Sequence, residues 1–254
     1  MRGNQFGGIG FYHYPDDVNT VLYGNHPVAF YLSEKNTFMK KLSFVVAAVV
    51  LLFSIFAVAT YFYNKQKADD ANAHALKNDL ILERSYSPTI GDKNAKVTIV
   101  EFFDPACETC KAFSPFLKQA MAAHPGKIRM VMRYLPLHQG SDEVVKLLQA
   151  AHQQNKFWDV LEDAYAGQSL WTKHHVAQPQ ILWKMLAYTE LDIEKAKLAA
   201  TSTDIAQQIQ QDISDARQLN VTKTPGFFVN GKPLINFGSQ PLREMIEAEI
   251  RNQY

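Results

Sequence analysis

The sequence predicts an α/β domain that follows a single membrane-spanning helix. Three observations predict it. An apolar segment near residue 50 carries no charge, and the pattern after it begins strand-helix-strand and ends strand-strand-helix. Two cysteines also lie where the first of these strands gives way to a helix. The part from about residue 84 to the C-terminus has the size of one domain.

The apolar segment Leu42–Tyr63 is 22 residues long and contains no charged side chain. At 1.5 Å per residue a helix of this length measures about 33 Å, which is enough to cross the hydrocarbon core of a membrane. The alternative is a cleaved signal peptide, because Ala57–Ala59 forms an A-x-A site. The length of the segment favours an uncleaved anchor. Both interpretations carry the C-terminal part across the membrane.

The segments on either side of this helix are polar. Residues 1–38 show no sustained apolar period, whereas Met39–Lys41 followed by the apolar run looks like the start of an exported protein. We therefore interpret Met39 as the start and residues 1–38 as an extension without a folded role, with a short cytosolic tail as the alternative. Residues 64–83 are polar and rich in Ala, which predicts a helical stalk before the domain at 84–254.

Composition excludes several classes of protein. With 26 basic and 25 acidic side chains the net charge is +1, so no long-range field draws in nucleic acid, and none is expected as a partner. Two cysteines cannot form the disulfide framework of a small secreted scaffold or a four-thiolate zinc site.

The first half of the domain reads strand, helix, strand. Lys96–Phe103 is a run of β-branched and aromatic residues, which is typical of a buried strand. Cys107–His124 has apolar residues at helical spacing, with Pro115 expected to kink the helix. Lys127–Tyr134 alternates between polar and apolar residues and predicts a second strand.

The second half begins with helices and ends with a hairpin and a helix. Residues 141–221 read as helical, with breaks near Gly167 and Gln178. Asn230–Gly231 is a strong two-residue hairpin signal between the expected strands Phe227–Val229 and Leu234–Phe237. The chain then closes with an amphipathic helix at 241–251.

The two cysteines, Cys107 and Cys110, form a CxxC pair at the start of the predicted helix. The first turn of a helix has unpaired N–H groups and a partial positive charge, and both stabilise a thiolate. Cys107 is therefore expected to have a lowered pKa and to act as a nucleophile, while Cys110 resolves the mixed disulfide. The alternatives are a zinc half-site or two inert thiols. Zinc would need two further ligands, and the sequence has no second CxxC or H-x3-H, so no metal is expected.

Two further features accompany the cysteines. Glu101 lies six residues before Cys107 in a strand that should be buried, where an acid could pass protons to and from Cys110. The alternative is that Glu101 reaches the surface or pairs with a lysine such as Lys127. The bond between Thr224 and Pro225 precedes a strand and can be cis, so this loop could hold a substrate chain beside the dithiol. An ordinary turn proline is the alternative.

Together these features resemble the thioredoxin superfamily, and in detail its DsbA-like branch. The matching segments are VTIVEFFDPACETCKAF from Val97, QNKFW from Gln154 and NVTKTPGFFVNG from Asn220. The resemblance covers roughly Ser87 to the C-terminus, with the motifs in the order of the family. It implies an α/β thioredoxin-like fold with a helical insertion at about residues 141–221.

The resemblance also implies roles for single residues. Cys107 would be the attacking cysteine, Cys110 its resolving partner and Glu101 the buried acid. Pro225 would be the cis-proline, with Thr224 facing the dithiol and both contributing to substrate binding.

The residues between the cysteines depart from the patterns of the family. Between the two cysteines this chain has Glu108 and Thr109. A Pro-His pair at these positions would resemble a strong oxidant of the family, and a Gly-Pro pair would resemble a reductant. We interpret Glu108 and Thr109 as redox-tuning residues. The negative charge of Glu108 should raise the pKa of Cys107 and make the protein a weaker oxidant.

The function expected from the resemblance is a membrane-anchored thiol:disulfide oxidoreductase in a bacterial periplasm. Its partners would be polypeptides with thiols or disulfides and, for an oxidase, a DsbB-like membrane protein that restores the disulfide between Cys107 and Cys110. No cofactor is expected. The redox direction stays open: a reductase or isomerase, or a tethered binding or chaperone module without redox turnover, are the alternatives.

Overall fold

The computed structural model describes residues 45–66 and 81–254, which fall into two units. The first contains all but the last two residues of the helix Val45–Gln66, which is long and apolar enough to cross a membrane by length and composition. It covers most of the predicted span Leu42–Tyr63 and ends three residues later. The expected extension at residues 1–38, and residues 67–80 of the expected stalk, lie outside the described residues.

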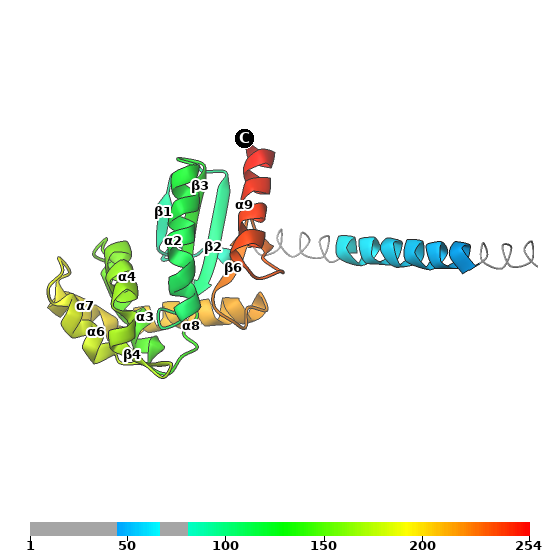
Figure 1. The fold of residues 1–254 in the computed structure, drawn as a ribbon. Coiled ribbons are helices and arrows are strands. Elements are labelled where there is room, and N and C mark those ends of the chain that lie inside the picture. The colour runs from blue at the N-terminus through cyan, green and yellow to red at the C-terminus, as the bar shows by residue number, and fades with distance from the viewer. Residues whose placement is uncertain (1–44, 67–80) are drawn as a thin grey trace, which may run out of the picture. The chain divides into compact units, whose positions relative to one another are not determined.

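The second unit is an α/β domain (Figure 1). Its strands and helices carry the labels of Figure 1 and follow in this order: β1 (Thr89–Gly91), β2 (Val97–Phe103), α2 (Glu108–Ala123), β3 (Ile128–Tyr134), α3 (Ser141–His152), α4 (Phe157–Ala166), α5 (Gln168–Trp171), β4 (Thr172–Lys173), β5 (Val176–Ala177), α6 (Pro179–Leu186), α7 (Ile193–Ala200), α8 (Thr203–Gln218), β6 (Gly226–Val229), β7 (Lys232–Pro233) and α9 (Ser239–Gln253).

Five strands form the main sheet in the order β1-β3-β2-β6-β7. β2 and β3 are parallel and joined by α2, whereas β1, β6 and β7 each pair antiparallel with their neighbours. Both central strands begin one residue later than the sequence predicted and end where it predicted, and α2 continues through Pro115. The thioredoxin-like fold with its helical insertion is therefore confirmed.

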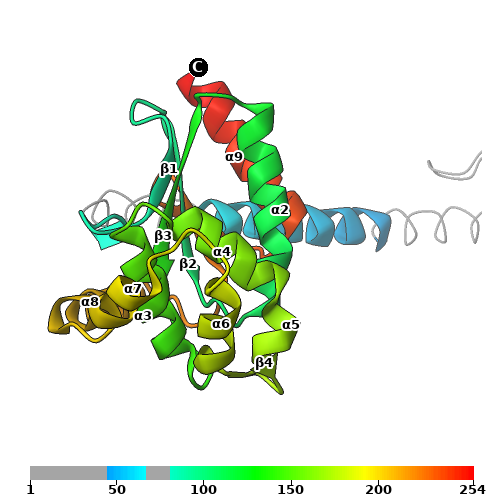
Figure 2. The ribbon, with the colours of Figure 1, turned by 90° about the vertical axis from the view of Figure 1, so that its left-hand side faces the viewer.

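The two faces of β2 are buried against different helices. Ile99 and Phe103 pack into the larger core, which includes residues of α2, α4 and α9, and Figure 2 shows α2 and α9 on the same side of the strands. Val100 and Phe102 point the other way, into a smaller core with Ala216 of α8. Because side chains alternate along a strand, Glu101 shares the face of Ile99 and Phe103.

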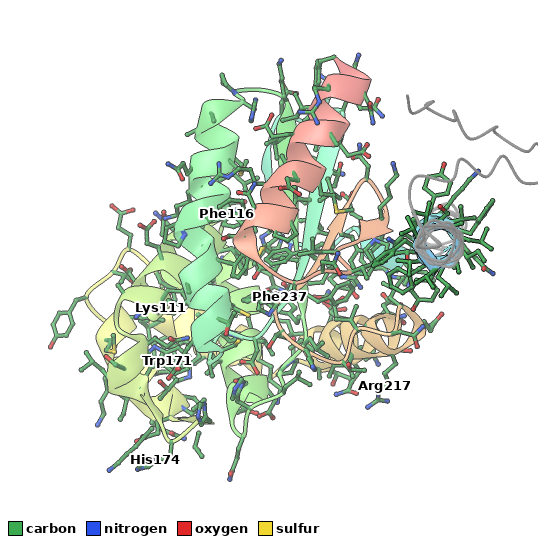
Figure 3. All side chains as sticks on the ribbon, turned by 45° about the vertical axis from the view of Figure 1, so that its right-hand side comes forward. Lys111, Phe116, Trp171, His174, Arg217 and Phe237 are labelled. Carbon is green, nitrogen blue, oxygen red and sulfur yellow. The ribbon has the colours of Figure 1, made fainter. Side chains whose placement is uncertain are left out.

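The helical insertion, from α3 to α8, lies at one end of the sheet (Figures 1 and 2). Phe157 and Trp171 are fully buried in its core, and Figure 3 labels Trp171 within these helices. The insertion also contains the two-stranded ribbon β4-β5, which the sequence did not predict because each strand has two residues and so carries no periodicity.

One strand of the predicted hairpin was placed wrongly. The turn is at Asn230 and Gly231, both with positive φ, and β7 therefore begins immediately after it, at Lys232. The predicted strand Leu234–Phe237 does not form. Instead the ring of Phe237 packs on the ring of Phe113 of α2, with 5.2 Å between the ring centroids. Figure 3 labels Phe237 beside that helix.

A buried ion network joins the insertion to the sheet. Arg133 of β3 is fully buried and donates to Asp212 at 2.8 Å and to Asp215 at 2.5 Å, both on α8. Asp215 also accepts from Arg84, at 2.7 Å, in the segment that leads into the domain. Asp212 accepts further hydrogen bonds from the Tyr86 hydroxyl and from a backbone N–H of β3, each at 2.8 Å. The network therefore fixes α8 and the start of the domain on one strand.

Replacing Arg133 with methionine should destabilise the domain by about 3–5 kcal/mol, because two buried carboxylates lose their shared cation. Urea unfolding of the full chain in detergent measures the change. Arg129→Met is the matched control, since Arg129 bonds the partly exposed Glu83 at the surface and should cost about 1 kcal/mol or less. Equal losses in the two variants would contradict this account.

Candidate functional site

The two cysteines lie at the beginning of α2, just beyond the end of β2. Cys107 is the N-cap residue, with φ −73° and ψ 118°, so the first backbone N–H groups of the helix surround its side chain. Both cysteines are free thiols. Cys107 is 7% exposed and Cys110, one turn later, is 1% exposed. An attacking molecule therefore meets Cys107 first.

The environment of Cys107 favours its thiolate. Its pKa is lowered to about 5, mainly by a hydrogen bond from the Cys110 thiol and further by Thr224 and the backbone N–H groups of Cys110 and Thr109, while burial opposes the shift. The N–H groups are those of the first helical turn, as the position of the CxxC predicts. At neutral pH this sulfur is a nucleophile without help from a base.

Cys110 has the opposite character. Burial holds its pKa well above the ordinary value, and the hydrogen bond to Cys107 and the charge of Glu101 add to the shift. Cys110 is therefore a protonated thiol at neutral pH. It must lose its proton to attack a sulfur, and it must gain one when it leaves a disulfide.

Glu101 is a buried carboxyl group whose charge influences the pKa of Cys110. It is 2% exposed, and its Oε1 has no hydrogen-bond partner among the described residues. Burial raises its pKa to about 8, with a further contribution from the charge of Cys107. The alternatives considered for this residue, exposure or an ion pair with Lys127, do not occur in the described structure. At neutral pH the carboxyl group is mostly protonated, and it gives up its proton at little cost.

The loop before β6 faces the cysteines. The Thr224–Pro225 peptide bond is cis, and the Cys107 sulfur lies 3.4 Å from the Thr224 carbonyl oxygen. The structure thus brings Thr224 to the dithiol from more than a hundred residues away. Glu108 and Thr109, the interpreted tuning residues, are exposed on the first turn of α2.

A buried carboxylate fixes the loop that leads into the cysteines. Asp104 is fully buried and accepts from the backbone N–H of Ala106 at 2.8 Å and from the Ser141 hydroxyl at 2.6 Å. It also accepts from the N–H groups of Leu137 and His138, at 2.7 and 2.9 Å, and lies 2.7 Å from His138 Nδ1. The start of the insertion is thereby bonded to the loop that carries Cys107.

A buried amide fixes the same loop from the other side. The Gln168 Nε2 of α5 donates to the carbonyl oxygens of Pro105 and Cys107, at 2.9 and 3.1 Å. Sequence reasoning missed both Asp104 and Gln168. An Asp before a Pro is a local turn signal that could have indicated Asp104. Nothing local could have indicated Gln168, because only the tertiary fold carries it to the loop.

The reactivity of Cys107 gives a direct test of its low pKa. The rate of alkylation by iodoacetamide should fall to half its plateau near pH 5, instead of near pH 8.5 for an ordinary cysteine. Cys110→Ala should move the midpoint to higher pH, because it removes the largest cause of the shift. A wild-type midpoint near 8.5 would contradict the proposed thiolate.

Comparisons with known proteins agree with this geometry. A sequence family described as Thioredoxin matches residues 83–248. The Na(+)/H(+) antiporter NhaA of Herminiimonas arsenicoxydans is 26% identical over 212 residues, which are 82% of this chain and 32% of the antiporter, so the chain spans about a third of that protein's length. Disulfide bond formation protein D of Bacillus subtilis is 26% identical over 174 residues, which are 65% of this chain and 78% of that protein.

A solved structure shows the same fold. The crystal structure of oxidised BdbD from Bacillus subtilis superposes with a TM-score of 0.59 at 25% identity, covering 65% of this chain and 94% of that one. The family match covers more than half of this chain and includes both cysteines. The chain therefore belongs to the thioredoxin family.

Proposed function

We propose that this protein is a membrane-anchored thiol:disulfide oxidase that forms disulfides in polypeptides on the periplasmic side of a bacterial inner membrane. The observation that carries the proposal is the contrast between the two sulfurs, since Cys107 is a thiolate and Cys110 a thiol at neutral pH. A thiolate stabilised in the reduced protein makes the corresponding disulfide oxidising, because reduction then gains that stabilisation.

The catalytic residues are Cys107, Cys110 and Glu101. A substrate thiolate attacks Cys107 Sγ, the bond between Cys107 and Cys110 breaks, and Cys110 leaves with the electron pair. Glu101 gives its proton to the Cys110 sulfur and becomes a carboxylate. A second substrate thiolate then attacks the substrate sulfur of the mixed disulfide, forms the substrate disulfide and releases Cys107 as a thiolate.

Other residues bind the substrate and tune the reaction. Thr224 and Pro225 hold the substrate chain next to Cys107, which the contact of the Thr224 carbonyl with the sulfur supports. Glu108 and Thr109 tune the reduction potential of the Cys107–Cys110 pair. The negative charge of Glu108 opposes the Cys107 thiolate and makes the protein a weaker oxidant than it would be without that charge. A DsbB-like membrane protein then restores the disulfide, and no cofactor or metal takes part.

The apolar helix supports the proposed location. The helix Val45–Gln66 suits a single-pass anchor, and a periplasm is the compartment in which disulfides form and persist. The relatives in Bacillus carry the name of disulfide bond formation, which supports the oxidising direction.

Stoichiometric mixing tests the proposal. The oxidised full chain in detergent is mixed with a reduced, unfolded polypeptide that has two cysteines. The polypeptide should gain one disulfide for each Cys107–Cys110 disulfide that is reduced. If the reduced chain instead opens the disulfide of the oxidised polypeptide, the protein is a reductase or isomerase. If neither exchange occurs, the chain is a tethered binding module.

A further inference from the structure

A cavity of about 160 Å³ is lined by residues of the sheet and of helices α2 and α4. Its wall is mostly apolar and includes Leu117 of α2, Met130 of β3 and Leu161 of α4. Two polar groups of the wall are buried: the carboxyl of Glu101, on β2, and the hydroxyl of Tyr165, on α4.

Both polar groups lack a hydrogen-bond partner among the described residues. The Glu101 Oε1 and the Tyr165 hydroxyl are buried side-chain oxygens with no protein group in range. A buried polar atom without a hydrogen bond is costly, so native structures satisfy such atoms with protein groups or ordered water. A water molecule needs about 10–15 Å³ of such a cavity and two to four polar partners, and this cavity offers both the room and the partners.

The cavity also reaches the surface. Lys118 of α2 and Glu162 of α4 belong to its wall, and their exposed side chains form an ion pair at 2.6 Å. The buried acid and a pair of solvated charges therefore line one continuous space. Lys118 and Glu162 thus stand at the exposed part of the wall, and Tyr165 and Glu101 at its buried part.

We propose that this cavity is the path by which Glu101 exchanges protons with solvent, and that Tyr165 is a positioning residue that holds water against the Glu101 carboxyl. The proposal rests on the proposed function, in which Glu101 serves Cys110. After Glu101 protonates the departing Cys110 sulfur, water held by Tyr165 gives a proton to the carboxylate. That water regains a proton from solvent past Lys118 and Glu162. The net change is one proton moved from solvent to the Cys110 sulfur.

The surroundings of Tyr165 suit this task. Burial holds its pKa well above the ordinary value, and the charges of Cys110 and Glu101 add to the shift. The hydroxyl therefore stays protonated while these groups change charge, and it remains a hydrogen-bond donor and acceptor throughout the cycle. It acts on the sulfur only through water and Glu101.

Tyr165→Phe tests the role of the hydroxyl alone. The carboxyl stretch of protonated Glu101 is followed by infrared titration of the oxidised full chain in detergent, with Glu101→Gln to identify the band. The variant should raise the pKa of Glu101 by about half a unit to one unit, because the carboxylate loses one water-mediated hydrogen bond. It should also slow the exchange of the carboxyl proton for deuterium from solvent.

Tyr134→Phe is the matched control. It removes another buried hydroxyl on the same side of the sheet, bonded to Gln149 Oε1 at 2.8 Å and outside the cavity wall. This variant should leave the Glu101 titration unchanged. Ser114→Leu, which fills the cavity from α2, is the second test and should raise the pKa of Glu101 and slow its deuterium exchange without touching Tyr165.

Two results would overturn the proposal. An unchanged Glu101 titration in Tyr165→Phe would show that the hydroxyl holds no water against the acid. Unchanged deuterium exchange in Ser114→Leu would show that the cavity is not the path. The infrared titration and the deuterium exchange do not depend on turnover. They can therefore support the cavity as the proton path even if the mixing experiment contradicts the proposed oxidase. Conversely, they can contradict the cavity as the path while the mixing experiment supports the oxidase.

Discussion

Replacing Cys107 with serine is expected to reduce thiol-disulfide exchange to the rate seen without protein. The variant keeps one cysteine, so it cannot form the disulfide that the proposed oxidase passes to a substrate. The remaining Cys110 thiol is buried and protonated and does not act as a nucleophile in place of Cys107. Cys110→Ser cannot form the Cys107–Cys110 disulfide either, but its Cys107 thiolate can attack a disulfide of an oxidised polypeptide and release one of the two polypeptide sulfurs as a thiolate, so that a mixed disulfide between Cys107 and the polypeptide accumulates. A non-reducing gel and mass spectrometry of the trapped species measure both outcomes.

The pair of variants separates an enzyme from a binding module. A module that only holds polypeptides would bind them equally well in both variants and would trap none of them covalently. Residual turnover in Cys107→Ser, or a mixed disulfide through Cys110, would contradict the assigned roles. Ser239→Ala, at the start of α9, is the control for a substitution elsewhere on the domain. This variant should catalyse thiol-disulfide exchange at the wild-type rate.

Glu101→Gln is expected to stabilise the domain while it slows the reaction. The folded pKa of Glu101, about 8, is raised above the ordinary value of 4.5. A raised pKa means that the stability carried by the protonated acid is fully present below pH 4.5 and is lost as the pH rises through 8. The neutral amide does not suffer this loss. The stability gain of the variant should therefore grow between pH 4.5 and 8 and then level off, with an upper bound of about 5 kcal/mol.

Denaturant unfolding at pH 5, 6.5 and 8 measures the gain in the free energy of unfolding. Single-turnover thiol-disulfide exchange measures the loss in reaction rate. The exchange rate should fall most at the pH where wild-type Glu101 is half ionised, because the amide neither gives nor takes a proton. Glu194→Gln is the matched control, since Glu194 forms an exposed pair with Lys197 and should change neither quantity by much. A stability difference that does not depend on pH would refute the raised pKa.

Local patterns predicted the parts of the fold that carry strong periodicity. The strands β2 and β3 are buried on both sides and appear in the sequence as β-branched and aromatic runs, and α2 shows an apolar face. The strand β1 is short and exposed, so no pattern distinguished it from a loop. The hairpin turn was predicted at the correct residues, but β7 was misplaced because the exposed run after Pro233 resembles a strand.

The site divides in the same way. The sequence indicated Cys107 and Cys110 as candidates by their spacing and Glu101 as an acid in an apolar strand, because each stands out against its neighbours. Asp104 and Gln168 form hydrogen bonds that join distant segments, and Tyr165 shares a cavity wall with Glu101 only because α4 packs on the sheet. Such contacts depend on the packing of the insertion against the sheet, which no local pattern encodes.

The reduction potential of the Cys107–Cys110 pair tests the central claim most directly. The full chain in detergent is equilibrated against glutathione buffers, and the fraction of free thiol is measured at each ratio. A stabilised Cys107 thiolate predicts a potential between roughly −120 and −180 mV, the range of oxidants and isomerases. A value near about −270 mV would place the protein among reductants and contradict the proposed oxidase.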